Sequence, residues 1–156
     1  LGLITGQMIG RWGNFINCEA FGRYTDCLFA MRIRRSIVNE SMISQNLLDH
    51  LILDNGIENI QVHPTFLYES LWNFGLLMFM FWFRKRKTFT GEMLCIYLAG
   101  YGIGRAWIEG LRTDSLLIPG TQIAVSQALS VVLATVSLVI LIYNRRKAFV
   151  QGKEAN

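Results

Sequence analysis

Residues 116–143 read LLIPGTQIAVSQALSVVLATVSLVILIY and contain no Asp, Glu, Lys or Arg. A membrane-spanning helix needs about 20 mostly apolar residues, and this stretch meets that requirement outright. The composition of the whole chain agrees, because 52% of its 156 residues are hydrophobic and only 17% are charged, against about 25% charge in an average soluble domain. Together these features predict an integral membrane protein.

Two earlier stretches, residues 66–83 and 93–108, are also apolar enough to span a membrane. Their polar interruptions are Glu69, Ser70, Asn73 and Arg105. Such residues are tolerated in a span when they face protein instead of lipid, and an ionisable residue there is a candidate for function. Residues 1–16 form a further apolar stretch, which we expect to be the end of a fourth helix.

Basic residues set the expected orientation. One cluster, residues 84–87, follows the first complete span, and another, residues 145–147, follows the last. Loops rich in Lys and Arg remain cytoplasmic, and two spans between the clusters place both on the same side. Residues 17–63 then lie outside, with four arginines against six acidic residues.

We therefore expect an all-α polytopic membrane bundle with a small mixed extracytoplasmic head segment. The expected parts are residues 1–16 as the end of a truncated transmembrane helix, 17–63 as the head, 64–147 as three transmembrane helices and 148–156 as a cytoplasmic tail. Within the head, the patterns predict strands at 31–34 and 57–62, a helix at 44–53 and a turn at Asn55-Gly56.

The run GRWGNFINCEAFG, residues 10–22, joins the first helix to the head. Arg11 and Asn14 are three residues apart and can share one face of a helix, and Asn17 and Glu19 follow at the water boundary. A guanidinium group with amide donors suits a lipid phosphate. The alternative is a snorkelling arginine with asparagines that cap the helix end. Glycines 6, 10 and 13 have the spacing of a close helix contact.

A second group is His63-Pro64-Thr65, followed by Tyr68 and Glu69. Proline is suited to the first turn of a helix, and a carboxylate near the helix N-terminus is favourable. His63 can titrate near neutral pH and accept a proton. The alternative is a helix start with an interfacial histidine that has no chemical role.

A third group of residues lies at the C-terminal end of the second complete span. Arg105, Glu109 and Arg112 are spaced to lie on one helical stripe, and Gly100 and Gly104 indicate close contact with another helix. The Arg105–Glu109 pair is open to a purely structural interpretation. Because this helix ends on the same side as Arg11, we expect one shared polar pocket.

The chain resembles the bacterial prolipoprotein diacylglyceryl transferase family. The resemblance is carried by Gly-Arg-x-Gly-Asn-Phe-x-Asn-x-Glu-x-x-Gly at residues 10–22, by His-Pro-Thr-x-x-Tyr-Glu at 63–69, and by Tyr-Gly-x-x-Arg at 101–105 with Glu109 and Arg112 downstream. It covers nearly the whole chain. The family's histidine of a His-Gly-Gly type motif has no counterpart here, so we interpret the chain as the C-terminal part of a longer protein.

The resemblance implies transfer of the diacylglyceryl group of phosphatidylglycerol to the lipobox cysteine thiol of a prolipoprotein in the bacterial cell membrane. The implied catalytic residues are Arg11, Arg105 and Glu109. The implied substrate-binding residues are Arg11, Asn14, Asn17, Glu19, Tyr68, Glu69 and Arg112. The implied partners are phosphatidylglycerol, the prolipoprotein signal peptide and membrane lipid. We expect no nucleic acid, metal or organic cofactor.

Two other functions fit the residues. A non-enzymatic membrane protein could bind an anionic lipid through the same arginines. A transporter-like bundle is disfavoured by the short outer loops and the lack of repeated halves. The three cysteines, Cys18, Cys27 and Cys95, have no metal-binding spacing. Cys18 and Cys27 are open to pairing if they face an oxidising compartment.

Overall fold

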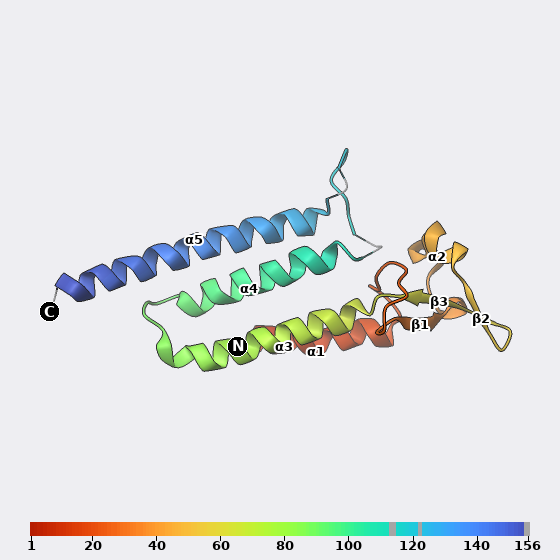
Figure 1. Cartoon of the computed structure of the whole chain (residues 1–156), viewed down its shortest axis with the longest axis horizontal. Coiled ribbons are helices and arrows are strands. Elements are labelled where there is room, and N and C mark those ends of the chain that lie inside the picture. The colour runs from red at the N-terminus through yellow and green to blue at the C-terminus, as the bar shows by residue number, and fades with distance from the viewer. Residues whose placement is uncertain (113–114, 122, 155–156) are drawn as a thin grey trace.

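The computed structural model describes residues 1–112, 115–121 and 123–154. Four long helices run along the molecule: α1 (Gly2–Ile16), α3 (Thr65–Phe83), α4 (Glu92–Glu109) and α5 (Val125–Glu154). A small head formed by the residues between α1 and α3 lies at one end, and the C-terminus lies at the other (Figure 1). The structure is mostly helical with a small three-stranded sheet in the head, as expected.

The polar residues of α3 face protein, as expected. Glu69, Ser70 and Asn73 are buried, whereas Leu71, Phe74 and other apolar side chains of this helix are exposed. Ser70 Oγ accepts a hydrogen bond from Trp12 Nε1 at 3.2 Å, which ties α3 to α1. The polar stripe therefore holds the bundle together.

Glycines allow α4 to pack tightly. A Cβ atom at Gly100 would lie 2.5 Å from Leu76 Cδ1, and one at Gly104 would clash with the Trp72 ring. The close contact expected from these two glycines is confirmed, and Trp72 Nε1 donates to the Gly100 carbonyl at 2.8 Å. At glycines 6, 10 and 13, a Cβ atom would meet nothing within 4 Å among the described residues, so the close contact expected there stays a prediction.

Helix α5 begins later than the uncharged run 116–143 suggests. Residues 116–121 and 123–124 precede it as a loop, with a bridge between Leu117 and Ala124 and a left-handed Gly120 at φ +80°. Pro119-Gly120 favours a turn and interrupts the apolar run. A short loop is expected around residues 113–120, and residues 115–121 are indeed not helical, while residues 113–114 lie outside the described residues.

The head is built on a three-stranded antiparallel sheet. Its strands are β1 (Met31–Arg34), β2 (Ile52–Asp54) and β3 (Ile57–Val62), in the order β1-β3-β2. Asn55 and Gly56 both have positive φ, 51° and 79°, as the tight turn of a β-hairpin requires. Buried Phe21, Ile33, Val38, Leu47, Ile60 and Val62 form the core of the head.

Short helices complete the head and the turn between α3 and α4. They are α2 (Gln45–Asp49), η1 (Arg35–Ile37), η2 (Glu40–Met42) and η3 (Arg84–Arg86). The helix expected at residues 44–53 is wrong in its second half, because residues 52–54 form β2. Pairing with β3 outweighs the helical spacing of the leucines there.

Two described helices are long and apolar enough to cross a membrane, Thr65–Arg86 and Val125–Gln151. Only 33% and 17% of their most apolar windows are buried inside the structure, unlike the core helix of a soluble protein. The two basic clusters lie at the end away from the head, because Arg145 contacts Glu92 and lies 4.7 Å from the centre of the Phe83 ring.

Candidate functional site

Glu69 on the first turns of α3 is the centre of a buried ionic cluster. Its Oε2 lies 2.5 Å from Arg11 Nε of α1, and its Oε1 lies 3.3 Å from Arg105 Nη1 of α4. The Glu69 side chain is 7% exposed, and the two arginine side chains are 19% and 18% exposed. One carboxylate thus holds two guanidinium groups from two different helices at the end of the bundle that carries the head.

Glu109, the last residue of α4, extends the cluster. Its Oε2 lies 2.8 Å from Arg105 Nη2 and 3.9 Å from Arg112 Nη1, and its Oε1 accepts a hydrogen bond from Ser115 Oγ at 2.9 Å. Oε2 is buried and, among the described residues, makes no hydrogen bond of good geometry, so its contacts with Arg105 and Arg112 are ion pairs. Arg112 lies beyond the end of α4 and not on its helical stripe, yet it still reaches Glu109.

These five side chains form one ionic chain, which runs Arg11, Glu69, Arg105, Glu109, Arg112. Among the described side chains, it contains three guanidinium groups and two carboxylates. Guanidinium groups bind phosphate through paired hydrogen bonds. Arg11, Arg105, Glu109 and Arg112, which were expected to share one polar pocket, are brought together by these ion pairs, and Glu69 joins the two halves of the ionic chain. Glu109 and Arg112 also line a cavity.

Three other predicted site residues lie at and just after the end of α1 and form no hydrogen bond or ion pair with the ionic chain among the described residues. Asn17 caps α1, and its Nδ2 donates to Glu19 Oε1 at 3.3 Å. Asn14 is half-buried on α1, and its carbonyl accepts from the Glu19 backbone N–H at 3.0 Å. The cap role that the sequence left open for the asparagines is met by Asn17.

Tyr68 belongs to a second group of polar side chains at the start of α3. Its hydroxyl lies 3.2 Å from His63 Nδ1 and 3.8 Å from Cys27 Sγ. Burial lowers the pKa of His63 below its ordinary value, so the neutral ring is favoured. The Thr25 hydroxyl, and to a smaller extent Tyr68, lower the pKa of the exposed Cys27 thiol.

Sequence reasoning considered Cys27 only as a partner of Cys18. Both thiols are free in the structure. The place of Cys27 beside Tyr68 depends on the path of the loop after Phe21, and neighbouring residues in the sequence give no signal of it.

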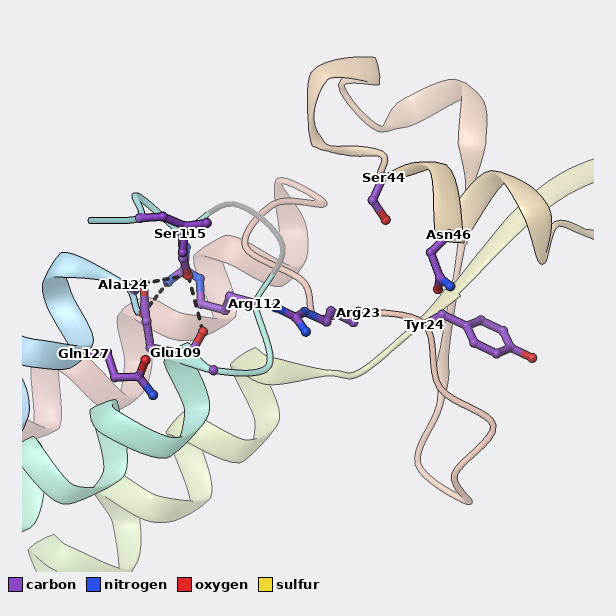
Figure 2. Close-up of a pocket in the computed structure, with 11 residues that line it drawn as sticks. Arg23, Tyr24, Ser44, Asn46, Glu109, Arg112, Ser115, Ala124 and Gln127 are labelled. Carbon is purple, nitrogen blue, oxygen red and sulfur yellow. Dashed lines mark hydrogen bonds and ion pairs between the residues drawn. The ribbon is translucent and has the colours of Figure 1, made fainter. Parts of the chain in front are cut away.

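A cavity of about 710 Å³ separates the head from the ends of α4 and α5 (Figure 2). Arg112 and Glu109 of the ionic chain form part of its wall. The side chains that line it from the head include Arg23, Ser44 and Asn46, and those from the bundle include Ser115 and Gln127. Sequence reasoning did not single out Arg23, although it directly follows the motif at residues 10–22.

Backbone pairing fixes Arg23 against the bundle. Its N–H donates to the Leu111 carbonyl at 2.9 Å, and its carbonyl accepts from the His63 N–H at 3.0 Å. Gly22 pairs with Arg112 in an antiparallel bridge. A Cβ atom at Gly22 would lie 2.6 Å from His63 Cβ, so the close approach requires glycine.

Within the described residues, no group of three or more His, Cys, Asp or Glu side chains is placed to hold a metal ion. The chemistry that the site can supply with its own groups is binding of an anion by arginines and hydrogen bonding by amides and hydroxyls.

The chain matches the family model described as prolipoprotein diacylglyceryl transferase over residues 1–143. A phosphatidylglycerol–prolipoprotein diacylglyceryl transferase of Bacillus velezensis is 36% identical over 99% of this chain and 52% of its own length. The proteins of the same name from Streptococcus agalactiae and Geobacillus kaustophilus are 42% and 38% identical, over 94% and 97% of this chain. The chain spans about half the length of the curated relatives it matches. No solved structure matches it.

Proposed function

The chain belongs to the prolipoprotein diacylglyceryl transferase family, and on that basis we propose that the protein it forms transfers the diacylglyceryl group of phosphatidylglycerol to the lipobox cysteine of prolipoproteins. The observation that carries this proposal is the ionic chain from Arg11 to Arg112. It places three guanidinium groups at the end of a bundle that has two described helices apolar enough to cross a membrane.

The reaction is a substitution at carbon. The thiolate of the lipobox cysteine attacks the glyceryl carbon that carries the phosphate, a C–S bond forms and the C–O bond to the phosphate breaks. The electron pair of that bond leaves with the oxygen, so the leaving group is a glycerol phosphate. Cationic groups placed where this charge develops lower the barrier, and the thiolate is the nucleophilic form of cysteine.

The residues divide the work as follows. Arg11 and Arg105 hold the phosphate, and Glu69 keeps their two guanidinium groups side by side between α1 and α4. Glu109 orients Arg105 and Arg112. These contacts support a cationic site whose parts are fixed before the lipid arrives, which reduces the cost of reorganisation during the reaction.

The remaining proposed substrate-binding residues surround this site. Asn14, Asn17 and Glu19 lie at the end of α1 beside Arg11, where they position the lipid or the thiol. Tyr68 precedes Glu69 and faces the head, and its hydroxyl lies 3.2 Å from Nδ1 of His63, whose pKa is lowered by burial. The prolipoprotein signal peptide is the second substrate.

We place the protein in the bacterial cell membrane as a multi-pass bundle, with the head outside and the C-terminus in the cytoplasm. The two basic clusters support this placement, because they lie at the end of the bundle opposite the head. The exposed apolar side chains of α5, including Leu129, Val132, Val136 and Val139, then face lipid.

The direct test is an assay on membranes that contain the complete gene product. Phosphatidylglycerol with a radiolabelled acyl chain and a lipobox peptide are supplied, and the thioether product is measured by mass. We expect product with phosphatidylglycerol and none with a peptide whose lipobox cysteine is replaced by serine. Retention of the labelled lipid without any thioether would contradict the proposal and favour a lipid-binding protein that is not an enzyme.

A further inference from the structure

The cavity between the head and the bundle holds two arginines that approach it from opposite elements. Arg23 comes from the head and Arg112 from the turn after α4, and both line the same space (Figure 2). The hydrogen bond between the Arg23 N–H and the Leu111 carbonyl fixes their backbones next to each other. Two guanidinium groups that share one cavity repel each other unless an anion lies between them.

The described lining supplies one carboxylate, that of Glu109. This carboxylate already pairs with Arg105 and Arg112. Arg23 therefore adds positive charge to the cavity that Glu109 does not balance. An anion with several oxygens, such as a phosphate, is the ligand that two guanidinium groups suit best.

The other polar side chains that line the cavity can form hydrogen bonds with the hydroxyl groups of a ligand. Ser44 and Asn46 come from the head, and Ser115 and Gln127 come from the bundle. The side-chain N–H of Gln127 donates a hydrogen bond to the Ala106 carbonyl at 2.7 Å. The side-chain oxygen of Gln127 remains as an acceptor for a ligand. Hydroxyl and amide side chains of this kind both donate to and accept from the hydroxyls of a polyol.

We propose that this cavity binds the glycerol phosphate headgroup and holds it after it has left the lipid, with Arg23 as its additional cation. The ligand class is a polyol phosphate monoester. This inference rests on the proposed function, because the transfer reaction is what produces such a leaving group. A volume of about 710 Å³ lies within the range of about 300–1,000 Å³ for small-molecule sites.

The charge change during the reaction explains why a second cationic site is needed. The phosphodiester of the lipid carries one negative charge, and the phosphate monoester that leaves carries about 1.5 to 2 at pH 7. Arg112 belongs both to the ionic chain and to the cavity wall. The leaving group can therefore pass from Arg105 to Arg112 and Arg23 as its charge increases.

The test measures binding of sn-glycerol 1-phosphate to the purified full-length protein in lipid nanodiscs, by titration calorimetry. Arg23→Gln is compared with Arg32→Gln, a matched head arginine that is exposed and does not line the cavity. We expect Arg23→Gln to weaken binding at least about tenfold, as expected for the loss of one charged hydrogen bond. Arg32→Gln should leave binding unchanged. Equal affinities in all three proteins would overturn the inference.

A second pair of probes tests the polyol part. Inorganic phosphate should bind more weakly than sn-glycerol 1-phosphate, and Gln127→Ala should weaken only the glycerol phosphate. Equal affinities for inorganic phosphate and sn-glycerol 1-phosphate would show that the cavity recognises only the phosphate. That result would overturn the assignment of a polyol ligand. Unchanged melting temperatures of both variants show that folding is not the cause.

The binding experiment and the transfer assay can fail independently of each other. If thioether forms but glycerol phosphate binding does not depend on Arg23, this inference fails and the transferase stands. If glycerol phosphate binds in an Arg23-dependent way but no thioether forms, the cavity site stands and the proposed reaction fails.

Discussion

At the scale of single residues, Glu69 decides whether the arginines can share a site. Two guanidinium groups inside a bundle are costly without a counter-charge, and the Glu69 carboxylate pairs with both. Without it, the ends of α1 and α4 would repel each other. The same residue thus contributes to packing and to the arrangement of the site.

Replacement of Glu69 by glutamine tests this role. Glu69→Gln leaves Arg11 and Arg105 largely buried with weaker partners, and we expect a loss of about 3 kcal/mol in the free energy of unfolding. The matched control is Glu58→Gln, whose pair with Arg35 is exposed on the head and should contribute about 1 kcal/mol or less. Denaturant unfolding in detergent measures both. Equal losses for the two variants would contradict the role of Glu69.

The Cys27 thiol gives a pH-dependent prediction. Because the Thr25 hydroxyl lowers its pKa, the reactive thiolate should form at a lower pH than in an ordinary cysteine. In a Cys18→Ser, Cys95→Ser background, the iodoacetamide rate should reach its plateau at lower pH with Thr25 than with Thr25→Val. At pH well above both pKa values the two rates should converge. Identical pH profiles would show that Thr25 has no influence on the thiol.

Sequence reasoning found the charged members of the site and missed residues placed by loops. Arg11, Arg105, Glu109 and Arg112 were predicted to converge because their helices end on the same side, and they do. Arg23 and Cys27 lie on the loop that crosses from α1 to the head. Their neighbours come from α4 and α3, and no local pattern encodes such distant contacts.

At the scale of elements, the junction between the head and the bundle depends on one close backbone approach. Gly22 lies against His63, Thr65 and the Leu111 carbonyl, and the bridge between Gly22 and Arg112 fixes the loop to the end of α4. This junction also forms one wall of the cavity that Arg23 and Arg112 share.

Substitution of this glycine should loosen the head. In Gly22→Ala the new Cβ atom would lie 2.6 Å from His63 Cβ and 3.1 Å from the Leu111 carbonyl oxygen. We expect the free energy of unfolding to fall by about 1–3 kcal/mol because of overpacking. The measurement is the rate of proteolysis of the head, which should increase. Gly75→Ala on α3 is the control, because its Cβ atom meets nothing within 4 Å. Equal cleavage rates for the two variants would show that the junction tolerates a side chain.

The elements that sequence reasoning predicted best are those with a complete local signal. The strands at 31–34 and 57–62 follow from the alternation of apolar and polar residues, and the turn before β3 follows from Asn55-Gly56. β2 was missed because residues 44–53 have helical spacing, and only pairing with β3 makes residues 52–54 a strand. The uncharged run 116–143 begins before α5, because hydropathy alone does not show the turn at Pro119-Gly120.

At the scale of the whole molecule, charged residues are concentrated at the two opposite ends of the helical bundle. The head and the ionic chain lie at one end, and the clusters at residues 84–87 and 145–147 lie at the other. Between them, α3 and α5 expose large apolar side chains. This distribution favours a molecule that crosses the bilayer along its long axis.

Labelling of single cysteines tests the orientation. In a variant without native cysteines, Asn39→Cys on the exposed surface of the head should react with a membrane-impermeant maleimide in intact spheroplasts. Thr90→Cys, in the turn between α3 and α4, should react only after the membrane is opened. Labelling of Thr90→Cys but not Asn39→Cys in intact spheroplasts would show the opposite orientation. Labelling of both sites in intact spheroplasts would also contradict the proposed topology.

The most direct test of the central claim is the rate of diacylglyceryl transfer from phosphatidylglycerol to a lipobox peptide by the complete gene product with Arg105→Ala. Arg105 links Glu69 to Glu109, and loss of one group that stabilises developing charge typically costs about 10²- to 10³-fold in rate. We predict a loss of this size, with Arg146→Ala, exposed at the opposite end of the bundle, retaining the full rate. Full transfer activity in Arg105→Ala would contradict the account.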